Sequence, residues 1–237
     1  MIKKYWRSQF KWLFLSSILE SIGANLFGIV LLMMIAANFT GAQRGWLITA
    51  ASIVNIMPAV LSAVTGYYAD RTANKITVSR IIRCCQMMLY LIIAFYAQSL
   101  SIATMIIILL IISVVKFGGG YAGGLLYEKE IQVVANQDRE QIMAWSSGVT
   151  STIAMVAQFI GPALLFLVHD HYGYFALLNA AIFGVSALLL GNLRDTPKAI
   201  ISPESTTQDN KSQISFLEAI RTIFSIPLLG WYISVYT

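Results

Sequence analysis

The chain has 237 residues, of which 57% are apolar and 11% are charged. A soluble domain carries about 25% charged residues, so this composition excludes a soluble globular protein and predicts an all-α integral membrane protein. A membrane-spanning helix needs about 20 apolar residues, which leaves room for six such helices and a remainder. The net charge of +5 does not indicate nucleic-acid binding, because the basic residues are spread over the predicted loops.

The first apolar run follows a basic and aromatic stretch, residues 1–11, which we place in the cytoplasm. The run extends from Trp12 to about Ala37, which is too long for the apolar region of a signal peptide, so it is interpreted as an uncleaved first helix. Glu20 lies inside it, roughly 12 Å along the helix from Trp12. A carboxylate at that depth usually faces the bundle interior or a water-filled cavity. We expect Glu20 to bind a proton or a cationic substrate; the alternative is an internally paired structural carboxylate.

The second helix is predicted from about Gly45 to Tyr68, after a short external loop over residues 38–43. Small and polar residues recur along one side of this helix. Such a stripe more often packs helices together than contacts a substrate, and Asn55 is the member that we single out as a candidate substrate contact. Pro58 removes a backbone hydrogen bond in mid-helix and predicts a kink.

A short charged connection follows the second helix and contains Gly66, Asp70, Arg71 and Lys75. Gly66 is expected to allow a close backbone approach near the helix end. Asp70 is expected to pair with nearby cations or to cap the next helix, and the basic residues favour the cytoplasmic side of the membrane.

The third helix is predicted over residues 76–97. Arg80 and Arg83 lie in its first two turns, and we expect both side chains to extend to the cytoplasmic surface. The adjacent Cys84 and Cys85 are expected to be small packing residues rather than a disulfide or a metal site.

The fourth helix is predicted to begin near Ser101, which places Lys116 near the middle of the bilayer. The glycine-rich stretch 118–124 predicts close packing against another helix. We expect Lys116 to couple protonation to conformational change; the alternative is a structural lysine bonded to backbone carbonyls.

The charged segment 127–141 is predicted to be the second cytoplasmic loop. A fifth helix over residues 142–168 contains Gly161 and Pro162, which predict a kink. A sixth helix follows over residues 172–193. The two histidines in the turn between these helices supply too few ligands for a metal ion.

Composition changes after the sixth helix. Residues 194–215 are polar and predict a flexible cytoplasmic linker, and residues 216–237 predict an amphipathic segment followed by the start of a seventh helix. The predicted divisions are therefore the N-terminus, a bundle over residues 12–193, the linker and the final segment. With the N-terminus inside, every basic residue except Arg44 and Lys116 lies on the cytoplasmic side.

The order Gly-x-x-x-Asp-Arg-x-x-x-Lys at residues 66–75 resembles the signature of the major facilitator superfamily between its second and third helices. Lys116 and Gly120 are similar to the Arg and Gly of the fourth-helix pattern, and Gly161-Pro162 is similar to the Gly-Pro of the fifth helix in exporters. Six helices followed by a polar linker resemble the N-terminal half of a twelve-helix transporter. Among members, the chain looks most like bacterial macrolide-efflux permeases.

The resemblance implies a six-helix half-bundle of two inverted three-helix repeats in the cell membrane, with a cytoplasmic N-terminus. It implies proton-coupled efflux of amphipathic drugs by alternating access. Glu20 would be the proton or substrate carboxylate, with Lys116 as its electrostatic partner. The Asp-Arg loop would be a conformational latch, in which Glu128 or Glu130 pairs with Arg71. The implied partners are a small-molecule substrate, protons, membrane lipid and a C-terminal half.

Two other functions fit the same sequence. One is an uptake permease of the same superfamily for a sugar, nucleoside or other metabolite. The other is a truncated, non-transporting membrane protein, or a half-module that needs a partner. An enzyme is not expected, because no nucleophile–base set or metal-ligand spacing appears, and no cofactor is implied.

Overall fold

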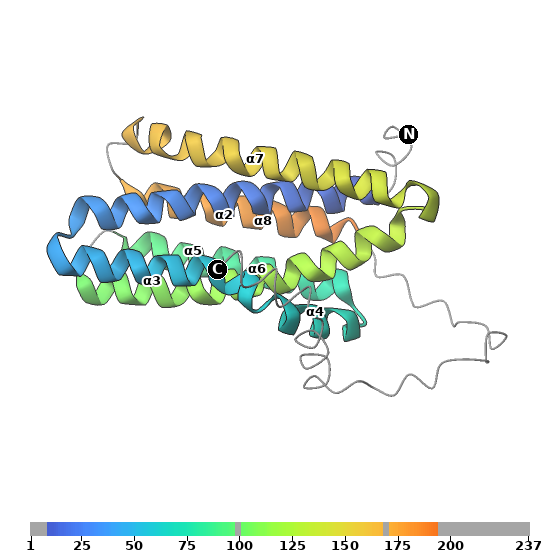
Figure 1. Ribbon diagram of the computed structural model, residues 1–237, viewed down its shortest axis with the longest axis horizontal. Coiled ribbons are helices and arrows are strands. Elements are labelled where there is room, and N and C mark those ends of the chain that lie inside the picture. The colour runs from blue at the N-terminus through green and yellow to red at the C-terminus, as the bar shows by residue number, and fades with distance from the viewer. Residues whose placement is uncertain (1–8, 98–100, 168–170, 194–237) are drawn as a thin grey trace, which may run out of the picture. The chain divides into compact units, whose positions relative to one another are not determined.

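The computed structural model describes residues 9–97, 101–167 and 171–193, and the regular elements in these ranges are all helical (Figure 1). The predicted linker and final segment, like residues 1–8, lie outside these ranges. The elements are α2 (Phe10–Asn38), α3 (Gly41–Val60), α4 (Ser62–Arg71), α5 (Lys75–Tyr96), α6 (Ile102–Val133), the 3-10 turn η1 (Asn136–Asp138), α7 (Arg139–Leu167) and α8 (Tyr172–Gly191).

The described helices fit a multi-pass membrane protein. Five of them are long and apolar enough to cross a membrane, and the bent pair of α3 and α4 is a sixth candidate. α6 alone has 32 residues, or roughly 48 Å at 1.5 Å per residue, which exceeds the ~30 Å hydrocarbon core. The predicted all-α membrane class is therefore supported.

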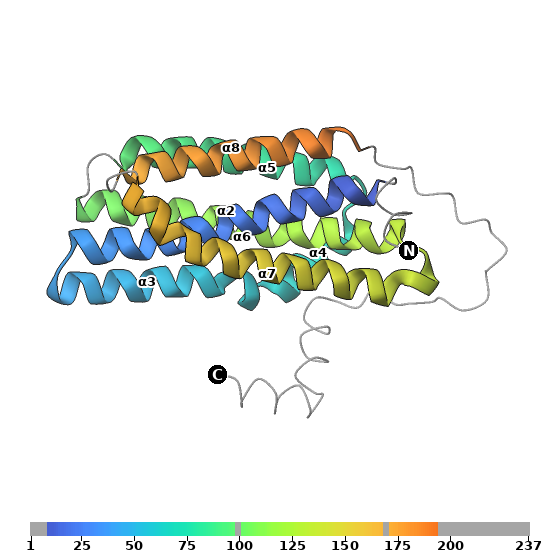
Figure 2. The ribbon, with the colours of Figure 1, turned by 90° about the horizontal axis from the view of Figure 1, so that it is seen from above.

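The helices pack in three layers. α5 and α8 form one outer layer, α2 and α6 form the middle, and α3 and α7 form the opposite outer layer (Figure 2). α5 packs against both α6 and α8, whereas α7 packs mainly against α2. The middle helices α2 and α6 thus contact both outer layers, and any charged residue on their facing sides lies inside the bundle.

The core is apolar and aromatic where the middle layer meets α5 and α8. Tyr90 of α5 stacks on Phe183 of α8 with ring centroids 5.3 Å apart, and it meets Phe27 of α2 edge to face at 5.1 Å. Tyr90 is 1% exposed and Phe183 is also 1% exposed. Aromatic pairs in these geometries add to the stability gained by burying the rings.

The second predicted helix is broken in two. Its first part starts earlier than expected, at Gly41, so the predicted external loop shrinks to the two residues between α2 and α3. The helix is interrupted at Leu61, and the two parts are bent by 44°. The interruption lies one turn after Pro58, whose missing N–H leaves the preceding turn without a backbone hydrogen bond. The predicted kink is therefore present, displaced toward α4.

The predicted loop over residues 127–141 was wrong. α6 continues through the charged residues to Val133, and only a short turn separates it from α7. The reason is apolar packing at helical spacing. Leu126 is buried against Leu13 of α2 and Ile76 of α5, and Val134 against the first turns of α2 and α7. Continuing the helix buries these side chains, and it carries Lys129 and Glu130 into the bundle with them, at 6% and 5% exposure.

Candidate functional site

Two side chains of opposite charge meet inside the bundle. Arg83 of α5 donates from Nη2 to Oε2 of Glu20 on α2. The Arg83 side chain is 0% exposed and that of Glu20 is 21% exposed. Removing an ion from water costs several kcal/mol, so a guanidinium in this position requires a carboxylate beside it.

A chain of polar contacts extends from this pair to α6. Arg83 Nη1 donates to Gln86 Oε1 at 2.9 Å, and Gln86 Nε2 donates to the carbonyl of Val115 at 2.9 Å. The guanidinium also lies 5.6 Å from the ring centroid of Phe183, on α8. Arg83 Nε has no hydrogen-bond partner among the described residues. The network therefore ties α2, α5, α6 and α8 to one buried cation.

The expectation that Arg83 reaches the membrane surface was wrong, whereas Arg80 is exposed and lies against Gly191 at the end of α8. The two arginines are three residues apart and therefore about 60° apart around the helix axis, which leaves Arg83 on the buried face of α5 and Arg80 at its exposed edge. The buried residues of α5 include Ile76, Ser79, Arg83, Gln86, Tyr90 and Ile93. This alternation of three and four residues is the sequence signal that identifies Arg83 and Gln86 as interior residues.

Lys116 does not pair directly with Glu20 as expected. Its Nζ donates to the carbonyl of Ala24 on α2 at 3.4 Å, although the charges of Lys116 and Glu20 are close enough to interact. Arg83 takes the place at Glu20 that was predicted for Lys116. Glu20 therefore has two cations near it, Arg83 and Lys116.

A pocket of about 230 Å³ lies beside this cluster, and we call it the Lys116 pocket. Its lining includes Glu20, Gln86 and Lys116. Gly119 keeps α6 close to the charged pair, because a Cβ there would lie 3.2 Å from Gln86 Nε2 and 3.3 Å from Glu20 Oε1. The predicted close packing of the glycine-rich stretch is thus present at the polar cluster.

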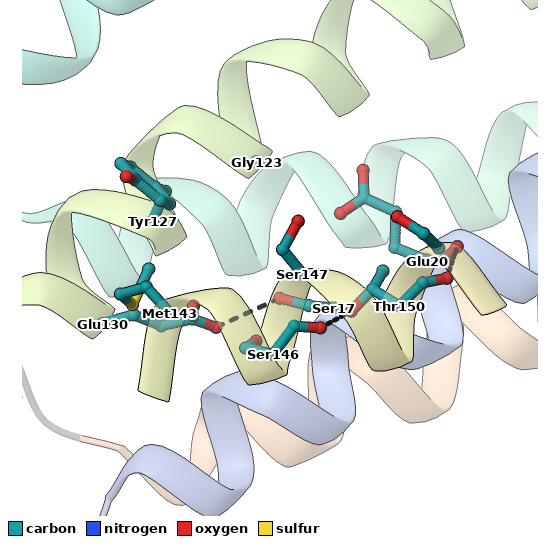
Figure 3. A pocket seen from close by; sticks show the side chains of 11 residues that line it. Ser17, Glu20, Gly123, Tyr127, Glu130, Met143, Ser146, Ser147 and Thr150 are labelled. Carbon is teal, nitrogen blue, oxygen red and sulfur yellow. Dashed lines mark hydrogen bonds between the residues drawn. The ribbon is translucent and has the colours of Figure 1, made fainter. Parts of the chain in front are cut away.

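A larger pocket of about 380 Å³ lies between α2, α6 and α7, and we call it the α7 pocket. Glu20 and Glu130 lie at its two ends, with hydroxyl side chains between them (Figure 3). Glu20 therefore borders both pockets. The aliphatic hydroxyls of the α7 pocket belong to Ser17, Ser21, Ser146, Ser147, Thr150 and Ser151.

The connection between α4 and α5 is tied to α6 by a second group of charges. Lys75 is 8% exposed, donates from Nζ to the Ala69 carbonyl, and lies 3.7 Å from Oε2 of Glu128. Asp70 lies close to the same carboxyl group. Thr72 Oγ1 shares a hydrogen bond of 2.6 Å with the hydroxyl of Tyr121 on α6. We call this group the α4–α6 contact.

Arg71 takes a different position from the one the resemblance implied. It is exposed, and its guanidinium lies 4.0 Å from the ring centroid of Tyr67, in its own helix. Glu128 pairs with Lys75, and Glu130 faces the α7 pocket. Neither of the two acidic residues therefore forms the predicted ion pair with Arg71 in this structure.

Other predicted positions have structural roles. Asn55 faces Gly28 of α2 and lines neither pocket. A Cβ added at Gly66 would meet no atom within 4 Å, so the expected close approach is not made within the described bundle. Cys84 and Cys85 are both exposed and do not pack inside it.

Gly161 allows α7 to lie close to α2. A Cβ at this position would lie 2.5 Å from Ile29 Cγ2 and 3.6 Å from the Leu26 carbonyl. Pro162 follows within α7, which is assigned as one helix through this point. Gly161 thus provides room for helix packing, whereas the kink expected at the Gly-Pro pair stays a prediction.

Comparisons with protein-family models, with curated proteins and with solved structures gave no match. Within the described residues no group of three or more His, Cys, Asp or Glu side chains could hold a metal ion. The charged cluster and its two pockets are therefore the features from which a function can be inferred.

Proposed function

We propose that this protein is a membrane transporter of the major facilitator type, which moves small amphipathic molecules outward in exchange for protons. The observation that carries the proposal is the Arg83–Glu20 pair, buried where the Lys116 pocket and the α7 pocket adjoin. Ionisable groups inside a membrane bundle are costly, and they commonly mark substrate paths and proton relays. The outward direction rests on the resemblance to efflux permeases.

The packing of the helices supports this architecture. α2 packs on α8 as α6 packs on α5, and α2 packs on α7 as α6 packs on α3 and α4. Exchanging the first three spans with the last three therefore converts each of these contacts into another. Such a pattern is expected for two inverted three-helix repeats, which in this fold family form one of two bundles that rock around a midplane site. The proposal thus includes a second bundle as a partner.

In the proposed mechanism the Glu20 carboxylate exchanges the Arg83 guanidinium for a proton. With Arg83 bound, the carboxylate is neutralised inside the bundle. A proton arriving at Glu20 would remove the negative charge and leave Arg83 and Lys116 as two neighbouring cations, which disfavours the same packing. A conformational change requires contacts that differ between two states, and this exchange supplies them.

The α4–α6 contact would act as the latch. Lys75 and Glu128 hold the connection between α4 and α5 against α6, with Asp70 beside them. In the proposed orientation this end of the bundle is cytoplasmic, as is the N-terminus, and the membrane is the cell membrane. Opening the cytoplasmic side would separate these groups, so Asp70→Asn should slow turnover more than it weakens substrate binding.

The test is transport by this protein, together with the proposed second bundle, in liposomes that contain a pH-sensitive dye. Ethidium serves as the amphipathic probe. The proposal expects ethidium movement to follow an imposed proton gradient and to carry protons in the opposite direction. Glu20→Gln should abolish this coupling, whereas Glu140→Gln, an exposed carboxylate at the start of α7, should leave it intact. Unchanged coupling in both Glu20→Gln and Asp70→Asn would reject the proposal.

A further inference from the structure

The α7 pocket contains a second carboxylate that the proposed proton exchange does not use. Glu130 is 5% exposed, and its described hydrogen bond comes from the hydroxyl of Ser17 at 3.4 Å. Among the described residues Glu130 takes part in no ion pair. A buried carboxylate with only a long hydroxyl contact is poorly compensated, because burial penalises an ion that lacks an opposite charge.

The charges around the pocket leave one negative charge without a match. Glu20, at the other end of the pocket, is paired with Arg83. Among the residues that the structure describes, no Lys, Arg or His side chain lines the pocket. When Glu130 is ionised, it gives the described lining a net negative charge, and a ligand with one positive charge would neutralise it.

The rest of the lining suits an ammonium group rather than a bare metal ion. Thr150 Oγ1 donates to the Ser146 carbonyl within α7, which leaves its oxygen able to accept a further bond. The hydroxyls of Ser147 and Ser151 make no hydrogen bond in the part of the chain that the structure describes, and both residues are exposed. Serine and threonine oxygens accept hydrogen bonds from ammonium N–H groups.

The size of the pocket points to an organic molecule. Its volume of about 380 Å³ is far larger than the ~30 Å³ that one water occupies in the liquid, and it falls at the small end of the ~300–1,000 Å³ of ligand pockets. Tyr127 and Met143 add an aromatic ring and a thioether to the wall. An aromatic face and a soft sulfur both favour an organic cation.

We propose that the α7 pocket binds the protonated amine of a small organic molecule, with Glu130 as the counter-charge and the α7 hydroxyls as hydrogen-bond acceptors. As a substrate site this inference rests on the proposed transport function. As a binding site it can be measured without transport.

The test compares a charged ligand with a neutral one of the same shape. Tryptamine carries an ammonium group where tryptophol carries a hydroxyl, and both are titrated calorimetrically into the protein in lipid nanodiscs. Tryptamine should bind at least about tenfold more tightly, as expected for a hydrogen bond to a buried charge. Glu130→Gln should remove this preference. Glu140→Gln, an exposed carboxylate at the start of α7 and outside the pocket, should retain it.

A second pair of variants keeps the test valid if Glu130→Gln fails to fold. Ser147→Phe fills the pocket from an exposed position on α7 and should weaken tryptamine binding about tenfold, whereas Thr152→Phe, exposed on α7 but outside the pocket, should not. Equal binding of the two ligands by the unmodified protein, or no binding of tryptamine, overturns the inference. Tryptamine binding that requires Glu130, in a protein without proton-coupled transport, would keep this site and reject the transport function. Proton-coupled transport without a tryptamine preference would keep the transport function and reject this binding site.

Discussion

Glu20 and Glu130 border the same pocket but differ in what lies beside them. Glu20, on α2, meets a fully buried guanidinium, whereas Glu130, on α6, meets a serine hydroxyl at 3.4 Å. The first carboxylate is neutralised within the protein, and the second can be neutralised by a ligand. The role proposed for each carboxylate thus follows from the side chain that lies beside it.

The largest effect is expected from removing the cation of the first pair. Arg83→Met leaves Glu20 without its partner, and losing one member of a buried pair costs about 3–5 kcal/mol. The folded yield and the midpoint of thermal unfolding, followed by circular dichroism, should both fall sharply. The matched control is Arg80→Met, one turn earlier and exposed, which should leave both unchanged. Equal behaviour of the two variants would show that Arg83 is not the buried partner.

Removing both members of the pair should be milder than removing one. In the double variant Glu20→Gln, Arg83→Met no buried ion of this pair is left unpaired, and replacing a buried pair by neutral groups is often tolerated. Most of the thermal midpoint lost in Arg83→Met should therefore return. A double variant that is as unstable as the sum of its single variants would mean that the two side chains are not coupled.

The packing of α7 on α2 at Gly161 should affect the α7 pocket, which Glu130 borders. Gly161→Ala forces α7 away from Ile29 of α2, at a cost of about 1–3 kcal/mol. The displaced α7 should also weaken tryptamine binding in the α7 pocket. Gly148→Ala provides the control on the same helix, because a Cβ there meets nothing within 4 Å. Both thermal unfolding and calorimetry should separate the variants; identical curves would contradict the observed helix packing.

The smallest effect is expected at the hydroxyl beside Glu130. Ser17→Ala removes a long hydrogen bond of the kind worth about 0.5–1.5 kcal/mol. It also leaves the carboxylate more dependent on the ligand, so tryptamine should bind equally well or slightly more tightly. Ser52→Ala, whose hydroxyl bonds the Ile48 carbonyl in its own helix, should change nothing. A large loss of affinity in Ser17→Ala would mean that Ser17, and not Glu130, is the main ligand contact.

The sequence predicted the apolar spans, but it did not predict all of their bounds or the partners of their charged residues. Long apolar runs predicted the spans, and their bounds agree within a few residues for α2, α5 and α8. The extension of α6 was missed, because charge was taken as a sign of a loop while the apolar spacing of Leu126 and Val134 continued the helix. Glu20 could be selected as a buried carboxylate from one helix alone. Its partner lies 63 residues away on α5, and no local pattern links the two.

The measurement that tests the central claim most directly is proton-coupled ethidium transport by the double variant Glu20→Gln, Arg83→Met, once its thermal stability is shown to be restored. If the pair serves transport, the protein should fold and insert into liposomes but move no protons with ethidium. If the pair only holds the helices together, restored stability should bring restored coupling. Coupled transport at the rate of the unmodified protein would therefore contradict the proposed function.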